Sequence, residues 1–481
     1  MSLLLLGTLG IFPAAAQDDA TTQNGASGYN GAYITGPASN PLSFLNGPAY
    51  RTTGQNTPYD FPDFAPMTAL DRQLPAWIGF GLEERLRWEE MYNQSFKRNN
   101  DDGYALNRLR LLMQIKPTNW LRIVGQVQDA RAWWQNPPLQ PPNTNRLDLK
   151  LAYAEIGDPE HHWISVRVGR QLINYNNTII ANSEWRDQGR SYDAVVTNFH
   201  YERFRLGIFA ASAVVPLDEG ISHHQEGNNI YGMYGAIDNL IAPTSTFEPF
   251  VLWRVNPSVS VETAGKATTG HESEQAYGIR WKGQAFRNFD YSVEGIREAG
   301  VDGTNNIKAW GTTEGIGYRF AGLYWKPRAF TQYDFASGDK NPHDGVHGAF
   351  DTMYPTAHDR FGVSDQFGWQ NIKAIRAGVT IEPHNRWTVT GQWLDFWLAS
   401  ATDSLYNTSG GSIVRSTNGT AGTHVGNEAD FYTWYEINRH VNIGVGVAHI
   451  FPGQFLLLTE KGPNFTYPYF ALNFKDAGKT H

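Results

Sequence analysis

The chain of 481 residues contains no cysteine, which excludes a disulfide scaffold and any metal site built from thiolates. After residue 16, no segment approaches the roughly 20 unbroken apolar residues that a membrane-spanning helix needs. The net charge is −8, so there is no basic excess that would indicate a nucleic-acid partner. Neither a Gly-x-Ser-x-Gly elbow nor a His-Glu-x-x-His motif occurs, and the sequence therefore indicates no enzyme, no bound metal and no cofactor.

What the chain has in excess is aromatic residues and glycine. Phe, Trp and Tyr make up 14% of the residues, 48 residues are Gly, and the mean hydropathy is only −0.45. A helical membrane protein would be more apolar, and a disordered chain would carry fewer aromatic residues. The combination suits strands that face lipid on one side and water on the other.

The N-terminal residues resemble an export signal. Residues 3–12 are mostly apolar and are followed by a Pro-Ala-Ala-Ala boundary and an acidic stretch, so residues 1–16 are predicted to be a signal peptide. Residues 17–75 are rich in Gly, Pro, Asn, Thr and Ala without a period, which predicts an extended N-terminal segment. We expect a barrel over residues 76–474 and a short C-terminal tail over 475–481, because an exported chain without a spanning helix is either soluble or a closed barrel.

From Trp77 onward, apolar and polar residues alternate. Successive strand residues point to opposite faces of a sheet, so each alternating segment has one apolar face and one charged face. The first segment has Ile78, Phe80, Leu82, Leu86 and Trp88 on one face and Gly79, Gly81, Glu83, Arg85, Arg87 and Glu89 on the other. The next segment alternates Leu109, Leu111, Met113 and Ile115 with Arg108, Arg110, Leu112, Gln114 and Lys116.

The connections between these segments distinguish a membrane barrel from a soluble sandwich. Short connections are predicted at 117–119, 158–160, 201–202, 319–322, 383–385 and 438–440. Long connections are predicted near 91–104, 132–146, 171–190, 214–229, 255–274, 335–368, 398–426 and 451–465. Short periplasmic turns and long extracellular loops are typical of outer-membrane barrels. The pattern predicts an all-β transmembrane antiparallel barrel of about 18 strands with both ends on the periplasmic side.

Tryptophans gather near the ends of the predicted strands. Trp and Tyr favour the level of the lipid headgroups, so most of these residues are expected to form girdles at the membrane surfaces or to pack within the protein, and the alternative is that some stack on sugars. The residues are Trp133, Trp134, Trp163, Trp185, Trp281, Trp325, Trp369, Trp387, Trp393, Trp397 and Trp434.

Charged residues on the predicted inner face are the candidates for function. A guanidinium group binds carboxylates through two parallel donors, and a ring of such groups attracts anions into a pore. Nearby acidic residues, including Glu83, Glu89 and Asp129, would keep the arginines upright. Because Arg170 has the parity of apolar neighbours, we expect a β-bulge that turns it into the lumen. The candidate pore residues are Arg85, Arg87, Arg108, Arg110, Arg167, Arg170, Arg190, Asp193, Glu428 and Asp430. The alternative is that these residues form salt bridges that only stiffen the wall.

Over residues 77–474 the chain resembles the alginate export family of outer-membrane proteins. Two matching motifs are Gly169-Arg170-Gln171 and Trp185 with Gly189, Arg190, Tyr192 and Asp193. Further matches are Tyr333 to Pro342, Phe350 to His358, Gly368-Trp369-Gln370-Asn371, Gly426 to Asp430, and Phe451-Pro452-Gly453.

The resemblance implies an eighteen-stranded barrel with an electropositive constriction that passes an anionic polyuronate outward. By motif position it assigns Arg170, Arg190 and Asp193 to the pore. This sequence departs from the family pattern after Tyr175, where the usual Gly and Arg are replaced within the run Tyr175 to Ile179. The connection at 438–440 is also much shorter than the periplasmic turn that closes the alginate exporter's pore.

Together these features predict a passive channel of the bacterial outer membrane for an anionic or neutral saccharide. Its expected surroundings are outer-membrane lipid, and periplasmic export machinery is a candidate partner. Two alternatives are a secreted soluble β-protein that binds or cleaves polysaccharide and a non-conducting outer-membrane structural protein. If the lumen arginines select the solute, Arg108→Glu or Arg170→Glu should reduce anion over cation permeability.

Overall fold

The computed structural model describes residues 65–136, 143–157, 163–176, 178–263, 266–286, 288–356, 358, 360–416, 418–459 and 462–477. The predicted signal peptide, residues 17–64 of the N-terminal segment and the predicted turn at 158–160 lie outside these residues, as do the side chains of 260–267.

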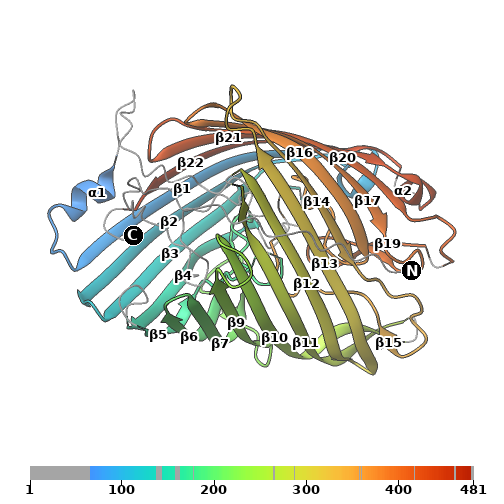
Figure 1. Ribbon diagram of the computed structural model, residues 1–481, viewed down its shortest axis with the longest axis horizontal. Helices are drawn as coiled ribbons and strands as arrows, with labels where there is room; N and C mark the ends of the chain where they lie inside the picture. The colour runs from blue at the N-terminus through green and yellow to red at the C-terminus, as the bar shows by residue number, and fades with distance from the viewer. Residues whose placement is uncertain are drawn as a thin grey trace, which may run out of the picture.

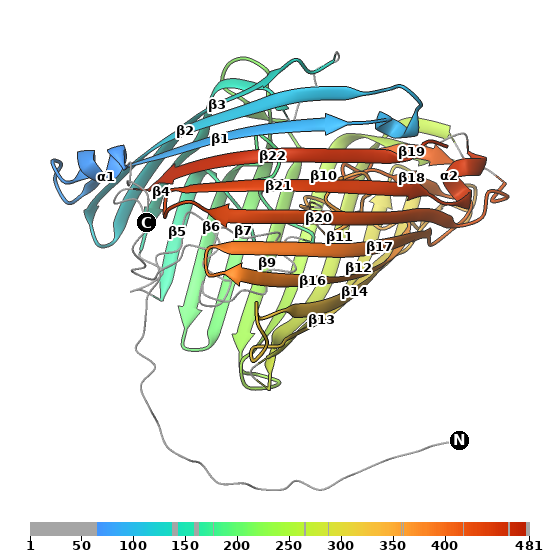
Figure 2. The same cartoon turned by 90° about the horizontal axis from the view of Figure 1, so that it is seen from above.

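The described chain forms a closed antiparallel barrel, and eighteen of its strands make the wall (Figure 1). The first and last wall strands, β1 and β22, pair with each other and close the sheet, as Figure 2 shows. The first nine wall strands are β1 (Ile78–Met91), β2 (Asp102–Thr118), β3 (Leu121–Trp133), β4 (Asn145–Ile156), β5 (Ile164–Gln171), β6 (Tyr192–Tyr201), β7 (Phe204–Val215), β9 (Asn229–Asp238) and β10 (Ser245–Thr263). The other nine are β11 (Lys266–Ala285), β12 (Phe289–Asp302), β13 (Asn305–Arg319), β14 (Arg328–Ala336), β16 (Ile372–His384), β17 (Trp387–Leu398), β20 (His424–Glu436), β21 (Val441–Pro452) and β22 (Phe465–Asp476).

The remaining elements are short and lie at the two ends of the barrel or in its loops. Among the described residues, no helix is long and apolar enough to cross a membrane. These elements are α1 (Pro66–Asp71), the 3-10 turn η1 (Gln94–Phe96), β8 (His223–His224), β15 (Val346–His347), β18 (Ser404–Tyr406), β19 (Ser412–Arg415) and α2 (Gln454–Leu458).

The predicted two-residue alternation sets the two faces of the wall. On β2, Leu109 and Met113 are 42% and 41% exposed on the outer face, whereas Arg108 and Arg110 are 2% and 4% exposed on the inner face. A strand pleat sends neighbouring side chains to opposite faces, and lipid covers the apolar one in a membrane barrel. The predicted arrangement of apolar exterior and charged interior is therefore confirmed.

Most connections follow the predicted rhythm, with two corrections. The short turn predicted at 319–322 is a longer connection, since β13 ends at Arg319 and β14 begins only at Arg328. Residues 255–274 do not form a long loop, because β10 and β11 continue pairing through this region as an extended hairpin. The short turns predicted at 117–119, 201–202, 383–385 and 438–440 each separate two paired wall strands. The last strand ends at Asp476, two residues beyond the predicted barrel boundary, since Lys475 and Asp476 still pair with β1.

The start of the described chain is attached to the end of the barrel. Residues 66–71 form helix α1, where the sequence predicted extended chain. The carboxylate of Asp476 accepts hydrogen bonds from the backbone N–H groups of Met67 and Thr68 at 2.7 and 3.1 Å and from the Thr68 hydroxyl at 2.7 Å. Since Asp476 is buried, this contact ties α1 to β22 and places both described termini at the short-turn end (Figure 2).

Two of the long connections fold inward and pack within the barrel. We call residues 172–191, between β5 and β6, loop A, and residues 337–371, between β14 and β16, loop B. Ile179 and Ile180 of loop A and Phe350 and Phe361 of loop B are buried in one apolar cluster with inward-facing wall residues such as Leu394. The interior of the barrel is thus partly filled by its own loops rather than by water alone.

Candidate functional site

The predicted wall arginines are brought together on β1 and β2, and loop A caps them. Arg85 donates hydrogen bonds to the carbonyl oxygens of Glu184 and Trp185 at 2.8 and 3.0 Å and to the Asp187 carboxylate at 2.9 Å. Arg110 lies 2.6 Å from the Glu184 carboxylate. Arg108 pairs with Glu83 of β1, as expected from the sequence, and also lies 3.3 Å from Glu184.

These contacts explain why loop A folds into the lumen at this place. A buried guanidinium without a partner is strongly destabilising, so each wall arginine needs an acceptor. Glu184 and Asp187 supply carboxylates, and the backbone between them supplies carbonyl groups. Burial raises the pKa of Glu184, but the charges of Arg110 and Arg108 outweigh it and lower the pKa to about 2. Glu184 is therefore ionised at neutral pH and holds loop A against the arginines.

Arg87 contacts an aromatic stack rather than open lumen. Its guanidinium lies 4.2 Å from the ring centroid of Trp185, and the other face of Trp185 stacks on His358 of loop B at 3.7 Å. Glu89 pairs with Arg87 on the same strand. Trp185 therefore packs inside the barrel and does not belong to a membrane girdle, because the ring is sandwiched between the wall and loop B. Trp369 is likewise buried in the core.

Arg167 is an inward-facing wall residue, as predicted. It lies 3.8 Å from Glu155 on β4, and its guanidinium is 5.2 Å from the ring centroid of Tyr153. Both partners are on the neighbouring strand, so Arg167 is neutralised within the wall.

Arg170 and Asp193 are not in the lumen. The expected bulge is absent, since β5 pairs with both β4 and β6 through Arg170 without a shift in register. Arg170 therefore keeps the outward parity of Val168, and its partner Asp193 keeps that of Val195. The two side chains form a two-donor ion pair at 2.8 and 3.0 Å near the loop end of the outer face.

The other acidic candidate on the outer face is Asp129, which was expected beside the lumen arginines. Its position on β3 alternates with the fully covered Gln128, and it pairs with Arg131 on the exposed side. The sequence could have shown this, because Asp129 has the parity of the apolar residues Ile123 and Val127.

Glu428 and Asp430 face the lumen and hold loop B. Glu428 accepts hydrogen bonds from the backbone N–H and the hydroxyl of Ser364 at 3.0 and 2.9 Å. Asp430 accepts one from the backbone N–H of Val363 at 3.1 Å. Gly362 is required here, because a Cβ at this position would lie 2.2 Å from the Glu428 carboxylate oxygens. The two carboxylates therefore bind the backbone of loop B instead of standing free in a pore.

Loop B is anchored to two more wall strands through ion pairs. Arg360 lies 2.6 Å from Asp334 on β14, and Asp351 lies 2.7 Å from Arg254 on β10. The loop is thus attached on widely separated parts of the wall and crosses the lumen between them.

Arg190 joins the two loops. Its guanidinium donates hydrogen bonds to the carbonyl oxygens of Ala181, Tyr354 and Pro355 at 2.9, 2.7 and 3.2 Å. The backbone N–H of Ala181 also donates to Tyr354, and Ile180 and Tyr354 form a parallel β-bridge. Loops A and B therefore form one connected unit within the barrel, which we call the two-loop plug.

Sequence reasoning did not select Arg186, although it lies within a quoted motif. Its guanidinium donates a hydrogen bond to the Ser409 hydroxyl at 3.0 Å. Burial and the nearby positive charge of Arg190 lower the pKa of Arg186, and Asp365 opposes this. Within the described residues, neither Arg186 nor Arg190 forms an ion pair with a carboxylate. A signal for this pair of arginines exists in the sequence, because Arg186 and Arg190 have a single acidic residue, Asp187, between them.

Several motifs of the family resemblance coincide with the plug and its supports, whereas Arg170 and Asp193 lie on the outer face. Trp185 and Arg190 are in loop A, and Phe350 to His358 and Gly368 to Asn371 are in loop B. Gly426 to Asp430 lie on the wall strand that binds loop B. Residues of these motifs therefore make contacts between the loops and the wall inside the barrel.

Solved porins of Pseudomonas aeruginosa are similar to this barrel. OccK8 (OprE) is similar with a TM-score of 0.54 at 10% identity, over 83% of this chain and 98% of that chain. OpdK crystallised with vanillate is similar with a TM-score of 0.54 at 8% identity, over 82% of this chain and 98% of that chain. At such low identity the likeness establishes the barrel fold alone. No curated protein matches the chain.

A family model described as alginate export matches residues 76–463, which is nearly the whole barrel. Together with the porin-like fold, this match identifies an outer-membrane channel for solutes. The chain belongs to the alginate export family.

Proposed function

We propose that the channel passes an anionic saccharide of the polyuronate type, whose carboxylates bind Arg186 and Arg190 of the two-loop plug. The observation that supports this proposal is the contrast between the partners of the wall arginines and those of Arg186 and Arg190. Carboxylates of the wall and of loop A pair with Arg85, Arg108 and Arg110. In the described part of the chain, only hydroxyl and carbonyl oxygens accept hydrogen bonds from Arg186 and Arg190, and the positive charge of Arg190 lowers the pKa of Arg186.

A saccharide carboxylate would relieve this accumulation of positive charge. A guanidinium offers two parallel donors to a carboxylate, and an ionised pair is stronger than a hydrogen bond to a neutral oxygen. Neutral sugars would gain only ordinary hydrogen bonds at the same place. The proposed site therefore favours uronates over neutral saccharides.

A saccharide can pass through the barrel only if the plug moves. The wall arginines explain why this movement would be favoured by an anionic solute. If loop A leaves the wall, Glu184 and Asp187 leave Arg110 and Arg85, and buried cations without partners are costly. Carboxylates of the solute can replace those of loop A on the same guanidinium groups. A cationic or neutral solute cannot, so the open state is stabilised selectively by anions.

Planar-bilayer recordings test the proposal. We expect short oligouronates to block the current, and Arg186→Gln to weaken this block by roughly fivefold to tenfold, as the loss of a charged hydrogen bond predicts. Arg203→Gln is the matched control, because Arg203 is an exposed cation in the short turn between β6 and β7. Equal block by neutral oligosaccharides, or unchanged block in Arg186→Gln, would contradict the assignment. Absence of any conductance would favour the structural-protein alternative.

A further inference from the structure

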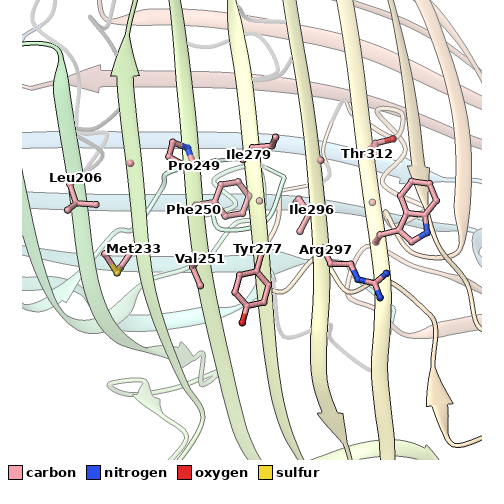
Figure 3. Close-up of a pocket in the computed structure, with 15 residues that line it drawn as sticks. Leu206, Met233, Pro249, Phe250, Val251, Tyr277, Ile279, Ile296, Arg297 and Thr312 are labelled. Atoms are coloured by element: carbon pink, nitrogen blue, oxygen red, sulfur yellow. The ribbon is translucent and has the colours of Figure 1, made fainter. Parts of the chain in front are cut away.

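The outer face of the barrel carries an apolar trough of about 690 Å³ that crosses β7 and β9 to β13 (Figure 3). Its lining includes the outward side chains of Leu206, Met233 and Val251 at one end and of Tyr277 and Trp310 toward the other. These side chains share the parity of the lipid-facing residues, so the trough opens to the bilayer rather than to the lumen.

Small residues in neighbouring strands create the depression. Gly235 on β9, Pro249 on β10 and Gly295 on β12 lie in one row across the sheet, on the short-turn side of Val251 and Tyr277, and the exposed Ile279 of β11 stands in this row between Pro249 and Gly295. A Cβ added at Gly295 would meet no heavy atom within 4 Å, so the space above this residue is open. The pairing of β9 with β10 is interrupted beside Pro249, which has no N–H to donate.

One cation, Arg297, lies in this apolar lining. It is exposed on the outer face of β12, directly between its cross-strand partners Tyr277 and Trp310. Among the described residues it forms no ion pair or hydrogen bond. The nearest outward carboxylate along β13 is Glu314, four residues or about 13 Å of strand beyond Trp310 toward the short turns.

A cation facing lipid is unfavourable in the middle of a bilayer and is tolerated near the headgroups. Tyr and Trp also prefer the headgroup level, so Tyr277 and Trp310 place Arg297 there. Arg297 is on the long-loop side of Gly295, which corresponds to the outer leaflet. An anion at this position would be the phosphate of a lipid headgroup, with its acyl chain extending over the small residues.

We propose that the trough is a binding site for lipid A of the outer leaflet. One phosphate pairs with Arg297, and one acyl chain lies over Gly295 and Pro249 beside Ile279; Figure 3 labels Arg297, Pro249 and Ile279. A second copy of this chain fits less well. A two-fold contact centred here would bring two Arg297 side chains, each without an acidic partner, toward the same apolar surface.

Native mass spectrometry of the purified barrel in detergent, titrated with lipid A, tests this site. Gly295→Leu fills the trough while adding an apolar side chain to the lipid face, and Arg297→Gln removes the charge. We expect each variant to weaken lipid A binding by roughly tenfold. Arg297→Gln loses the charged contact with the phosphate, and Gly295→Leu loses the apolar contact with the acyl chain. Phosphatidylglycerol, with one phosphate and two chains, is expected to bind more weakly than lipid A and to lose less in each variant.

Two control variants separate this site from the general lipid surface. Gly391→Leu adds the same side chain at another outward glycine with no heavy atom within 4 Å, and Lys373→Gln removes an outward cation on β16. Both should bind lipid A like the original chain. Equal lipid A binding by all five proteins would overturn the proposal. So would a change from oligomer to monomer in the trough variants at unchanged lipid occupancy, which would assign the trough to contact between copies.

Discussion

Glu184 offers the most direct test of how loop A is held in the lumen. Its carboxylate lies 2.6 Å from Arg110 and 3.3 Å from Arg108, and the substitution Glu184→Gln would remove the charge while keeping the shape. The pKa of Glu184 is lowered from 4.5 to about 2, which corresponds to about 3 kcal/mol. Because the side chain is 30% exposed, solvent screening reduces this to about 2 kcal/mol.

A loss of about 2 kcal/mol from the plugged state should raise the population of states with loop A released by about thirtyfold. In single-channel recordings at neutral pH, we expect Glu184→Gln to open more often and for longer than the original chain. Glu226→Gln is the matched control, since Glu226 is an exposed loop carboxylate at the same end of the barrel. It should leave the openings unchanged.

The dependence of the open probability on pH independently checks whether the charge of Glu184 stabilises the plugged state. The pKa of Glu184 is lower in the plugged state, so its stabilising effect is complete above pH 4.5 and is lost as the pH falls toward about 2. The difference in open probability between the original chain and Glu184→Gln should therefore shrink over this range. If the two proteins have the same open probability at pH 7, the arginine cluster does not hold loop A, and the reasoning is refuted.

Three further outcomes follow from other contacts. Arg170→Glu should leave the reversal potential unchanged, contrary to the expectation from the sequence, because Arg170 lies on the outer face; an altered reversal potential would place it in the ion path. A disulfide between cysteines introduced at Ile180 and Tyr354, which are β-bridge partners in a chain without other cysteines, should reduce conductance until it is reduced by dithiothreitol; equal conductance before and after reduction would argue against plug movement. Asp476→Ala removes three hydrogen bonds to α1 and should weaken its attachment by about 2 kcal/mol, seen as faster amide hydrogen exchange in α1; unchanged exchange would show that other contacts hold the helix.

The barrel could be predicted because its pattern is local. Apolar and charged residues alternate within each strand, and the short and long connections follow one another along the chain. The same rule misplaced residues 255–274, since polar residues beyond the lipid can pair as an extended hairpin without an apolar face. The alternation also holds at Arg170 without the β-bulge that we expected, because the register of β5 with β6 places Arg170 on the outer face.

The residues that face the lumen were predictable in part for the same reason. Arg85, Arg87, Arg108, Arg110 and Arg167 lie on the inner face, as do Glu428 and Asp430. Their chemical surroundings were not predictable, because the partners that neutralise Arg85 and Arg110 come from loop A, 102 and 74 residues away along the chain.

The sequence alone therefore determined which side of each strand meets lipid and which meets the lumen, since a two-residue period is a property of the extended backbone itself. Only the tertiary structure decided that loops A and B return into the barrel and bind charged wall residues such as Arg85, Arg110 and Glu428, leaving Arg186 and Arg190 without an ion pair among the described residues. Which groups neutralise a charged side chain depends on which segments, distant along the chain, meet in space. Residue spacing and periodicity describe only local structure and do not show this.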